Sequence, residues 1–283
     1  MEKNCKIKAI FIDLDGTLLN DQDQILPTTL SSLIKARHKK IKIIITTGRT
    51  LSQLPKFPDN LKIDYYIISN GACILDAQKK IIYQQGLSSK QARSILKLCK
   101  KNNLLIELNI KGQVYYQKEQ LTNLTDLKVP QKHLTKLLDI GISVDNLKTI
   151  LTKQTIIEKI NLFCLKEDYN DLKTKIIAQF KNLKVVSGGM ENIEITNTSK
   201  GKAIKYLSSL MEIDLKHCLA IGDSENDLEM IQTVKYGVTM ANACNLLKEK
   251  AVYVTDSNLN NGVGKIIDLL LKEEKNDSLS TRL

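Results

Sequence analysis

Two aspartates one residue apart, Asp13 and Asp15, end an apolar run and precede Gly16, which permits a tight turn. Carboxylates at the end of a buried strand must be solvated, paired or bound to a cation, because an isolated charge is costly to bury. Such a pair can supply a nucleophile and a proton donor to one reaction, and its oxygens suit a hard cation such as Mg²⁺. The rest of the chain decides whether this chemistry has the partners that it needs.

Three other short stretches carry polar groups at the ends of expected strands or at the start of a helix: TTGR at Thr46–Arg49, TSKGK at Thr198–Lys202 and GDSEND at Gly222–Asp227. In an open α/β sheet, ligands bind at the edge formed by the carboxyl ends of the strands. Asp223 and Asp227 bring the carboxylates at this edge to four, and these groups repel one another unless a cation is bound. Lys200 opens a helix and would project toward the same edge. We therefore predict a Mg²⁺ site there.

These side chains need a sheet that brings distant strands together, and the apolar pattern predicts one. Short β-branched runs at 7–12, 41–46 and 65–69 alternate with amphipathic stretches such as Pro27–Lys39, and the alternation returns after residue 199. Alternation of this kind indicates parallel βαβ units with right-handed crossovers. Strands that are apolar throughout fit a sheet covered on both faces. The expected fold class is α/β, with a Rossmann-like parallel sheet.

The middle of the chain has a different pattern. A helical stretch is followed by two strands around a Lys-Gly turn, then by a strand, a second helix and a second strand pair. This order is typical of an antiparallel α+β unit. We therefore predict a discontinuous core at 1–82 and 190–272, interrupted by an inserted α+β cap domain at 83–189. Residues 118–157 show no readable pattern, and a disordered polar tail is expected at 273–283.

Composition indicates a globular cytoplasmic protein. The chain has 283 residues, of which 42% are hydrophobic, and this is enough for a sizeable core. Six scattered cysteines without a C-x-x-C pair are expected to be reduced thiols. The charged N-terminus is not a signal peptide, and no run approaches the ~18 apolar residues that a membrane span requires.

The positive charge is concentrated in the expected cap. The net charge is +11, and residues 83–189 hold 18 Lys or Arg against nine Asp or Glu. One interpretation is a solvated, lysine-rich surface, and the other is a field that attracts anionic substrates. Nucleic acid is the weaker partner, because no aromatic-rich or compact Arg-rich motif accompanies the lysines.

The four motifs together resemble those of a known family. It is similar to the haloacid dehalogenase-like (HAD) superfamily, and within it to the Cof-type sugar-phosphatase branch, which has a large class II cap. The resemblance spans about residues 6–272, and its motifs are D-x-D-G-T at Asp13–Thr17, T-G-R at Thr47–Arg49, the lysine Lys200, and G-D-x-x-N-D at Gly222–Asp227. One departure is Asn261, where the branch usually has an aspartate before Gly-Val.

The resemblance implies a catalytic pair and a metal site. Asp13 would be the nucleophile that forms an aspartyl phosphate, and Asp15 would protonate the leaving group and later deprotonate water. Mg²⁺ would be held by the Asp13 carboxylate, the Asp15 backbone carbonyl and Asp223. Asp227 would act on the metal indirectly, by a hydrogen bond to one of these ligands or through a water molecule.

The resemblance also implies a phosphate cradle. Thr47 and Lys200 would bind the phosphoryl oxygens, and backbone N–H groups near Gly48 would complete the cradle. Arg49 would lie close to the substrate phosphate, and Asn226 would act in the same site or through a metal-bound water. The core motifs leave the cap residues that touch the leaving group unidentified.

The leading interpretation is a Mg²⁺-dependent phosphatase that hydrolyses small phosphorylated metabolites, either sugar phosphates or phosphorylated cofactors. A phosphohexomutase of a related branch is the alternative, since it would share the motifs and the cap. A non-catalytic phospho-receiver or binding module is disfavoured, because it has no need for the proton donor Asp15. The expected partner is a small phosphate ester, with no nucleic acid and no membrane, and the chain is expected to be a monomer or homodimer.

Overall fold

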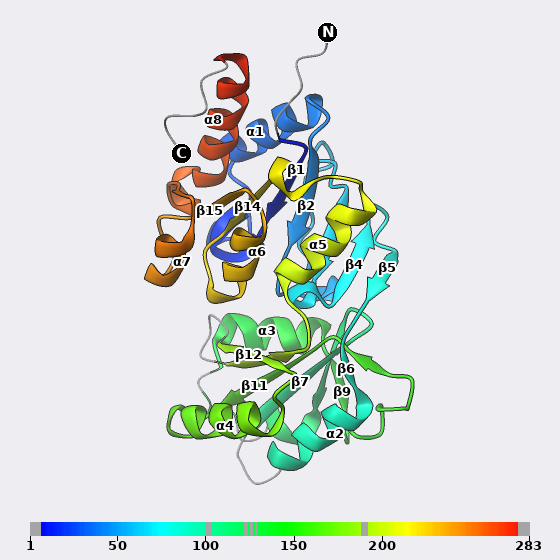
Figure 1. Cartoon of the computed structure of the whole chain (residues 1–283). Coiled ribbons are helices and arrows are strands. Elements are labelled where there is room, and N and C mark those ends of the chain that lie inside the picture. Colours follow the sequence, from blue (N-terminus) through cyan, green and yellow to red (C-terminus); the bar gives the residue numbers. More distant parts are fainter. Residues whose placement is uncertain are drawn as a thin grey trace.

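The computed structural model describes residues 7–99, 104–121, 124, 127, 129–187 and 192–276, with side chains described as far as Lys272. The chain forms an eight-stranded sheet, a six-stranded sheet and a two-stranded ribbon. In Figure 1 the larger sheet with its helices forms one lobe, the core, and the smaller sheet with its helices forms the second lobe, the cap. Helix α3 lies between the cap sheet and the core in this view. No helix among the described residues has the length and apolar character that crossing a membrane requires.

The core sheet has the strand order β16-β15-β14-β1-β2-β3-β4-β5. The six strands from β16 to β3 run parallel, and β4 and β5 are antiparallel additions at one edge. The strands are β1 Ala9–Ile12, β2 Lys42–Thr46, β3 Tyr65–Ile68, β4 Cys73–Asp76, β5 Ile81–Gln84, β14 Cys218–Gly222, β15 Tyr236–Thr239 and β16 Tyr253–Val254. The predicted parallel α/β core is therefore confirmed, and β1 lies in its interior.

Helices cover both faces of this sheet, as the apolar strands predict. They are α1 Pro27–His38, α5 Lys200–Leu210, α6 Leu228–Thr233, α7 Asn245–Lys250 and α8 Gly262–Asn276. Because strand side chains alternate between faces, Ile10 and Ile12 pack in the cluster that contains α1 and α8. Ala9 and Phe11 pack in the opposite cluster with α5, α6 and α7.

The cap sheet has the order β12-β13-β11-β7-β8-β9. It is antiparallel except for the β8–β9 pair. Its elements are β7 Leu104–Ile110, β8 Gln113–Gln117, β9 Ile142–Val144, β11 Lys159–Cys164, β12 Lys184–Ser187, β13 Ile193–Thr196, α2 Ser89–Leu98, α3 Gln131–Ile140 and α4 Lys166–Gln179. Side chains of α2 and α4 pack on one face of the sheet, and α3 packs on the other through Leu137.

The crossings between the lobes differ from the expected boundaries. β5 pairs in the core sheet as far as Gln84, and β13 pairs in the cap sheet. The expected return to the core at residue 190 therefore falls too early, because the chain leaves the cap only after Thr196. A two-stranded ribbon, β6 Leu87–Ser88 with β10 Ile156–Ile157, lies at the first crossing.

Two expectations about irregular parts also change. The stretch 118–157, which showed no readable pattern, contains α3, β9 and β10. Helix α8 continues to Asn276, so the tail does not begin at residue 273. The remainder of the expected tail, 277–283, lies outside the described residues.

Candidate active site

Three neighbouring parallel strands bring the predicted motifs together. Ile12 of β1 is in register with Ile45 of β2 and Ile221 of β14. The residues that follow these strand ends, Asp13 and Asp223 among them, therefore meet at the carboxyl edge of the sheet. The N-terminus of α5 supplies Lys200 to the same place, where its Nζ lies 2.5 Å from Asp13 Oδ1.

The turn after β1 depends on Gly16. The turn Leu14–Leu18 is interrupted at Asp15, with ψ 122°, and at Gly16, with φ +74°. A Cβ atom on Gly16 would lie 2.4 Å from Asp223 Oδ2, so a side chain there would push into the site. The turn also lets Thr17 Oγ1 donate to Asp223 Oδ1 over 2.8 Å. This turn therefore fixes Asp223 as well as presenting Asp13.

A buried lysine joins two of the aspartates. Lys200 Nζ lies 2.5 Å from Asp13 Oδ1 and 2.6 Å from Asp227 Oδ1, and its side chain has no exposed surface. The other oxygen of Asp227 accepts backbone N–H bonds from Asp223 and Ser224, each at 3.1 Å. Asp227 thus has both oxygens occupied, and its main effect is to hold Lys200 and the turn after β14.

Burial and mutual repulsion shape the charges of this cluster. Burial, followed by the Asp227 carboxylate, raises the pKa of Asp13 well above its usual range, although Lys200 opposes the shift. Burial and Asp227 raise the pKa of Asp223 to about 6. Burial disfavours the charge on Lys200, but the carboxylates of Asp13 and Asp227 outweigh it and raise the pKa of the lysine. The single positive charge of Lys200 therefore does not neutralise the carboxylates of the cluster.

The donor set fits a hard divalent cation. Carboxylate oxygens of Asp13, Asp223 and Asp227 lie within 4.8 Å of one another, and oxygen is the ligand atom that Mg²⁺ prefers. A cation would also relieve the repulsion by Asp227 that, after burial, raises the pKa of Asp223. Asp227 does not line the cavity, and its oxygens accept from Lys200 and from two backbone N–H groups. Asp223 lines the cavity and, within the described part of the chain, accepts only from the hydroxyl groups of Thr17 and Ser224. Asp13 and Asp223 are therefore the residues best placed to hold the ion directly.

Asp15 lies apart from this cluster. Its side chain is 60% exposed and its Oδ1 lies 2.5 Å from Arg49 Nη2, with a second bond of 2.9 Å from Arg49 Nε to Oδ2. Arg49 Nη2 also contacts Asp23 Oδ1 at 2.8 Å. The Asp15 side chain is thus not among the clustered carboxylates, and metal binding through its backbone carbonyl stays a prediction. No motif pointed to Asp23, which lies in the loop before α1.

Gly48 and Arg49 of the T-G-R segment line the same cavity as Asn226, whereas Thr47 does not. Thr47 is buried, and its Oγ1 accepts the Arg49 backbone N–H over 3.1 Å. Gly48 and Asn226 both line the cavity that contains Asp13. Asn226 Nδ2 donates to Asn70 Oδ1 over 3.1 Å. Their roles in phosphate binding stay predictions, but the structure brings them to the expected edge.

The cap closes the site from the opposite side. The cavity has a volume of about 430 Å³ and contains Asp13, Asp15 and Asp223 on its core side. Its cap side is formed by seven residues in or next to three elements. They are Lys132, His133 and Lys136 of α3, Lys159 and Asn161 of β11, and Asn192 and Glu194 at β13. Lys159 Nζ donates to the Gly48 carbonyl over 3.0 Å, which joins the cap to the core.

The cap side of the cavity was missed by motif reasoning, although the sequence carries a signal for it. Lys159 and Asn161 alternate with apolar residues in β11, and Asn192 and Glu194 do the same at β13. All four side chains are buried. Polar residues at every second position of a buried strand point to a shared polar face, and that face is the one turned toward the core motifs.

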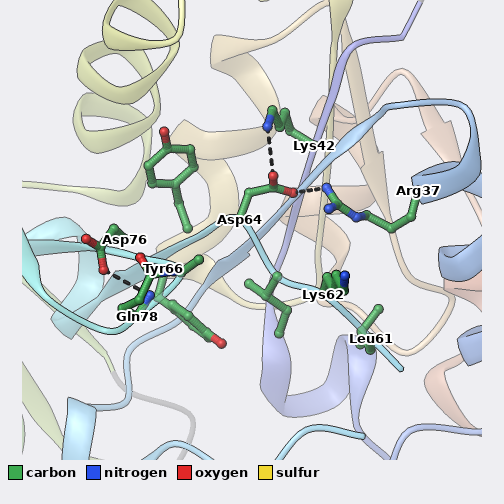
Figure 2. A pocket seen from close by; sticks show the side chains of 11 residues that line it. Arg37, Lys42, Leu61, Lys62, Asp64, Tyr66, Asp76 and Gln78 are labelled. Carbon is green, nitrogen blue, oxygen red and sulfur yellow. Dashed lines mark hydrogen bonds and ion pairs between the residues drawn. The ribbon is translucent and has the colours of Figure 1, made fainter. Parts of the chain in front are cut away.

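A second hollow, of about 560 Å³, lies on the core near Asp64 and Tyr66. It lies at the amino ends of β2 and β3, which is the sheet edge opposite to the candidate active site. Figure 2 shows that Asp64 contacts both Arg37 and Lys42 there. Asp64 also accepts the Ile43 backbone N–H over 3.0 Å. The carboxylate of Asp64 is therefore occupied by two cations and a backbone N–H group, so it does not compete as a catalytic group.

Comparisons with known proteins agree with this geometry. The family model of the haloacid dehalogenase-like hydrolases matches residues 10–267. Two Bacillus subtilis proteins named 5-amino-6-(5-phospho-D-ribitylamino)uracil phosphatase are similar: YcsE is 27% identical over 92% of this chain and 94% of its own length, and YwtE is 29% identical over 94% and 98%. A solved haloacid dehalogenase-like hydrolase from B. subtilis is 26% identical, covers 93% of this chain and 99% of its own, and has a TM-score of 0.81. The chain therefore belongs to the haloacid dehalogenase-like hydrolases, as an enzyme of the phosphatase group within that family.

Proposed function

We propose that this enzyme is a Mg²⁺-dependent phosphatase that hydrolyses small phosphorylated metabolites through an aspartyl phosphate on Asp13. The observation that carries the proposal is the position of Asp13, which is held by Lys200 beside Asp223 at the base of a cavity closed by the cap. Two relatives are named as phosphatases of a phosphorylated ribitylamino compound. These names support a small phosphorylated substrate and leave its identity open.

The residues at the base of the cavity suit phosphoryl transfer. Lys200 Nζ holds Asp13 Oδ1, which leaves the other oxygen of Asp13 to attack phosphorus. Lys200 also offsets the negative charge of the phosphoryl group as it approaches the carboxylate. Mg²⁺, bound by Asp13 and Asp223, would neutralise phosphate oxygens and help to align the group. Gly48 lies on the adjacent strand end and lines the cavity, where its backbone could contact the remaining phosphate oxygens. The predicted contact of Thr47 would require this buried side chain to become accessible.

Asp15 must separate from Arg49 before it can donate a proton. Both carboxyl oxygens of Asp15 accept hydrogen bonds from Arg49, whereas a proton donor must turn an O–H group toward the leaving group. Arg49 also contacts Asp23, so it can turn from Asp15 and keep an ion-pair partner. A substrate phosphate beside Arg49 would favour this exchange. Asp15 would then protonate the leaving alcohol and later accept a proton from the attacking water.

A panel of phosphorylated metabolites, assayed with Mg²⁺ and with excess chelator, tests the proposal. We expect inorganic phosphate to be released from sugar or polyol phosphates only when Mg²⁺ is present. Full activity after chelation and dialysis would contradict the metal assignment. A hexose 1-phosphate that is isomerised without release of phosphate would indicate the mutase instead.

The remaining expectations about the setting of the protein stay predictions. These are a monomer or homodimer, a cytoplasmic location and the absence of nucleic-acid binding. Running the panel beside a filter-binding assay with duplex and single-stranded nucleic acid tests the last of them. Tight nucleic-acid binding at physiological salt, without hydrolysis of any metabolite, would contradict both that expectation and the proposed function.

A further inference from the structure

Two asparagines on the cap side of the cavity have amide oxygens without a hydrogen-bond partner among the described residues. They are Asn161 of β11 and Asn192 just before β13, and both line the cavity that contains Asp13. Asn161 is 6% exposed and Asn192 is 3% exposed. A buried acceptor that makes no hydrogen bond is costly. Asn226, on the core side of the same cavity, also has an unpartnered amide oxygen. Two such acceptors on the cap side and a third facing them indicate that something else supplies the donors.

The orientation of the Asn161 amide is set by a buried carboxylate. Asn161 Nδ2 donates to Glu107 Oε2 over 2.9 Å, and His133 Nε2 lies 2.6 Å from Glu107 Oε1. Glu107 is completely buried and its Oε2 accepts this bond, whereas an amide oxygen has no hydrogen to donate. Turning the amide over would place its oxygen against Glu107. The oxygen of Asn161 is therefore the atom left for a ligand.

The cationic donors of the cavity, by contrast, already have acceptors. Lys159 donates to Glu194 and to the Gly48 carbonyl, Lys136 donates to the Gln53 carbonyl, and Arg49 contacts Asp15 and Asp23. Among the residues that the structure describes, the groups on the cap side that lack partners are thus the two amide oxygens, and they need hydrogen-bond donors from the ligand. A fully ionised phosphate or carboxylate has no hydrogen to give, whereas a hydroxyl group has one.

We propose that Asn161 and Asn192 accept hydrogen bonds from hydroxyl groups of the leaving alcohol, so that the cavity selects phosphate monoesters of polyols over those of plain alkyl chains. This inference rests on the proposed phosphatase function and adds to it the residues that read the leaving group. Glu107 is a positioning residue, because it acts by holding the Asn161 amide oxygen toward the ligand. A pocket that pairs its buried polar groups with substrate hydroxyls rejects the analogue that lacks them.

The test compares two substrates of equal chain length, ribitol 5-phosphate and pentyl phosphate. The measured quantity is the ratio of their kcat/KM values. The unmodified enzyme should prefer ribitol 5-phosphate, and Asn161→Leu or Asn192→Leu should each lower the ratio about tenfold, the scale of one lost hydrogen bond. Glu107→Gln keeps the shape of the side chain but allows the amide to turn, so it should also lower the ratio.

Asn109→Leu is the matched control. Asn109 of β7 is buried and also has an unpartnered amide oxygen, but it does not belong to the residues that line the cavity. Its substitution should leave the ratio unchanged even if the fold is destabilised, because a ratio of two substrates on one enzyme cancels the loss of folded protein. A similar fall in Asn109→Leu would overturn the proposal, as would unchanged ratios in Asn161→Leu and Asn192→Leu.

A binding experiment separates failure of this inference from failure of the proposed function. Calorimetry with the Asp13→Asn variant measures the affinity for ribitol 5-phosphate and pentyl phosphate without turnover. Tighter binding of ribitol 5-phosphate that is lost on adding Asn161→Leu supports the subsite even if no hydrolysis is ever found. Equal affinity for the two compounds overturns the subsite, whether or not the enzyme is a phosphatase.

Discussion

Lys200 is the residue on which the charges of the active site depend. It is buried between Asp13 and Asp227 at 2.5 and 2.6 Å. Removing one partner of a buried ion pair leaves an uncompensated charge, which typically costs about 3–5 kcal/mol. Lys200 therefore contributes both to the stability of the core and to the chemistry at its edge.

We predict that Lys200→Met abolishes turnover and lowers the free energy of unfolding by about 3 kcal/mol in the absence of Mg²⁺. The reason is that Asp13 and Asp227 would face each other in a buried site without a counter-charge. Urea denaturation and phosphate release measure the two effects. Lys202→Met, a change at an exposed lysine of the same helix, is the control. Wild-type stability of Lys200→Met would contradict the role of the ion pairs.

Asp13→Asn should abolish turnover and leave the fold intact. The nucleophile is lost, but burial and Asp227 already raise the pKa of Asp13, which means that its charge destabilises the folded state on balance. The free energy of unfolding without Mg²⁺ should therefore stay the same or rise. Phosphate release from a generic aryl phosphate measures turnover, and residual activity of roughly a tenth would show that Asp13 is not the nucleophile.

The raised pKa of Asp223, about 6, predicts a pH dependence of metal binding. Mg²⁺ binds the carboxylate form, so protons compete with the metal as the pH falls through about 6. The Mg²⁺ concentration for half-maximal activation should therefore rise steeply between pH 7 and pH 5. Calorimetric titration of Mg²⁺ at both values checks this directly. Equal affinity at pH 5 and pH 7 would show that Asp223 does not bind the ion.

At the scale of elements, the core was predictable because its strands are apolar on both faces. The run that forms β1 could only be a buried strand, and the acids that follow it could only lie at its end. The pairing of Asp15 with Arg49 was not predictable, because Arg49 is shared with Asp23, a loop residue that belongs to no motif. Helix α3 was missed although its apolar residues have helical spacing, because no side-chain cap marks its start.

The boundary after the cap was also missed, for a physical reason. β13 leads through Asn197–Ser199 directly into α5, and no glycine- or proline-rich linker separates the two lobes. The polar residues of β11 and β13 alternate as predicted for strands, but the sequence alone does not tell which lobe they face. Only the pairing of β13 with β11 and β12 assigns them to the cap.

Lys159 joins the two lobes, and its loss should loosen the cap. Lys159→Met removes the bond to the Gly48 carbonyl and the ion pair with Glu194. We expect KM to rise at least severalfold, because the closed cavity that holds the leaving group is less populated. Steady-state kinetics measure the change, and Lys153→Met, at an exposed cap position, is the control. An unchanged KM would show that this contact does not hold the cap.

At the scale of the whole molecule, the positive charge of the cap can attract an anionic substrate before it reaches the cavity. Lys132 is 66% exposed at the rim of the cavity, whereas the exposed Lys90 belongs to α2 on the face of the cap sheet opposite α3 (Figure 1). Lys132→Glu should raise KM more than it lowers kcat, because a rim charge attracts the anionic substrate. The effect should shrink in high salt, since exposed charges are screened over about 10 Å at 0.1 M.

Lys90→Glu makes the same change in net charge at a distance from the cavity. If charge at the rim matters, this variant should keep the wild-type KM at every salt concentration. If both variants raise KM equally, the net charge of the cap, rather than its placement around the active site, controls substrate capture.

The two crossings between the lobes have a consequence for how the chain folds. Asn197 Nδ2 donates to the Gly86 carbonyl over 2.6 Å, although the two residues are 111 positions apart. Pairing of β1 with β14 must close a loop that contains the whole cap, and the entropic cost of closure grows with the length of the loop. A cap that folds first holds its own two ends together and replaces that long loop by a single short bridge. If the cap folds first, the two halves of the core are close in space before they pair, and the entropic cost of joining β1 to β14 is smaller.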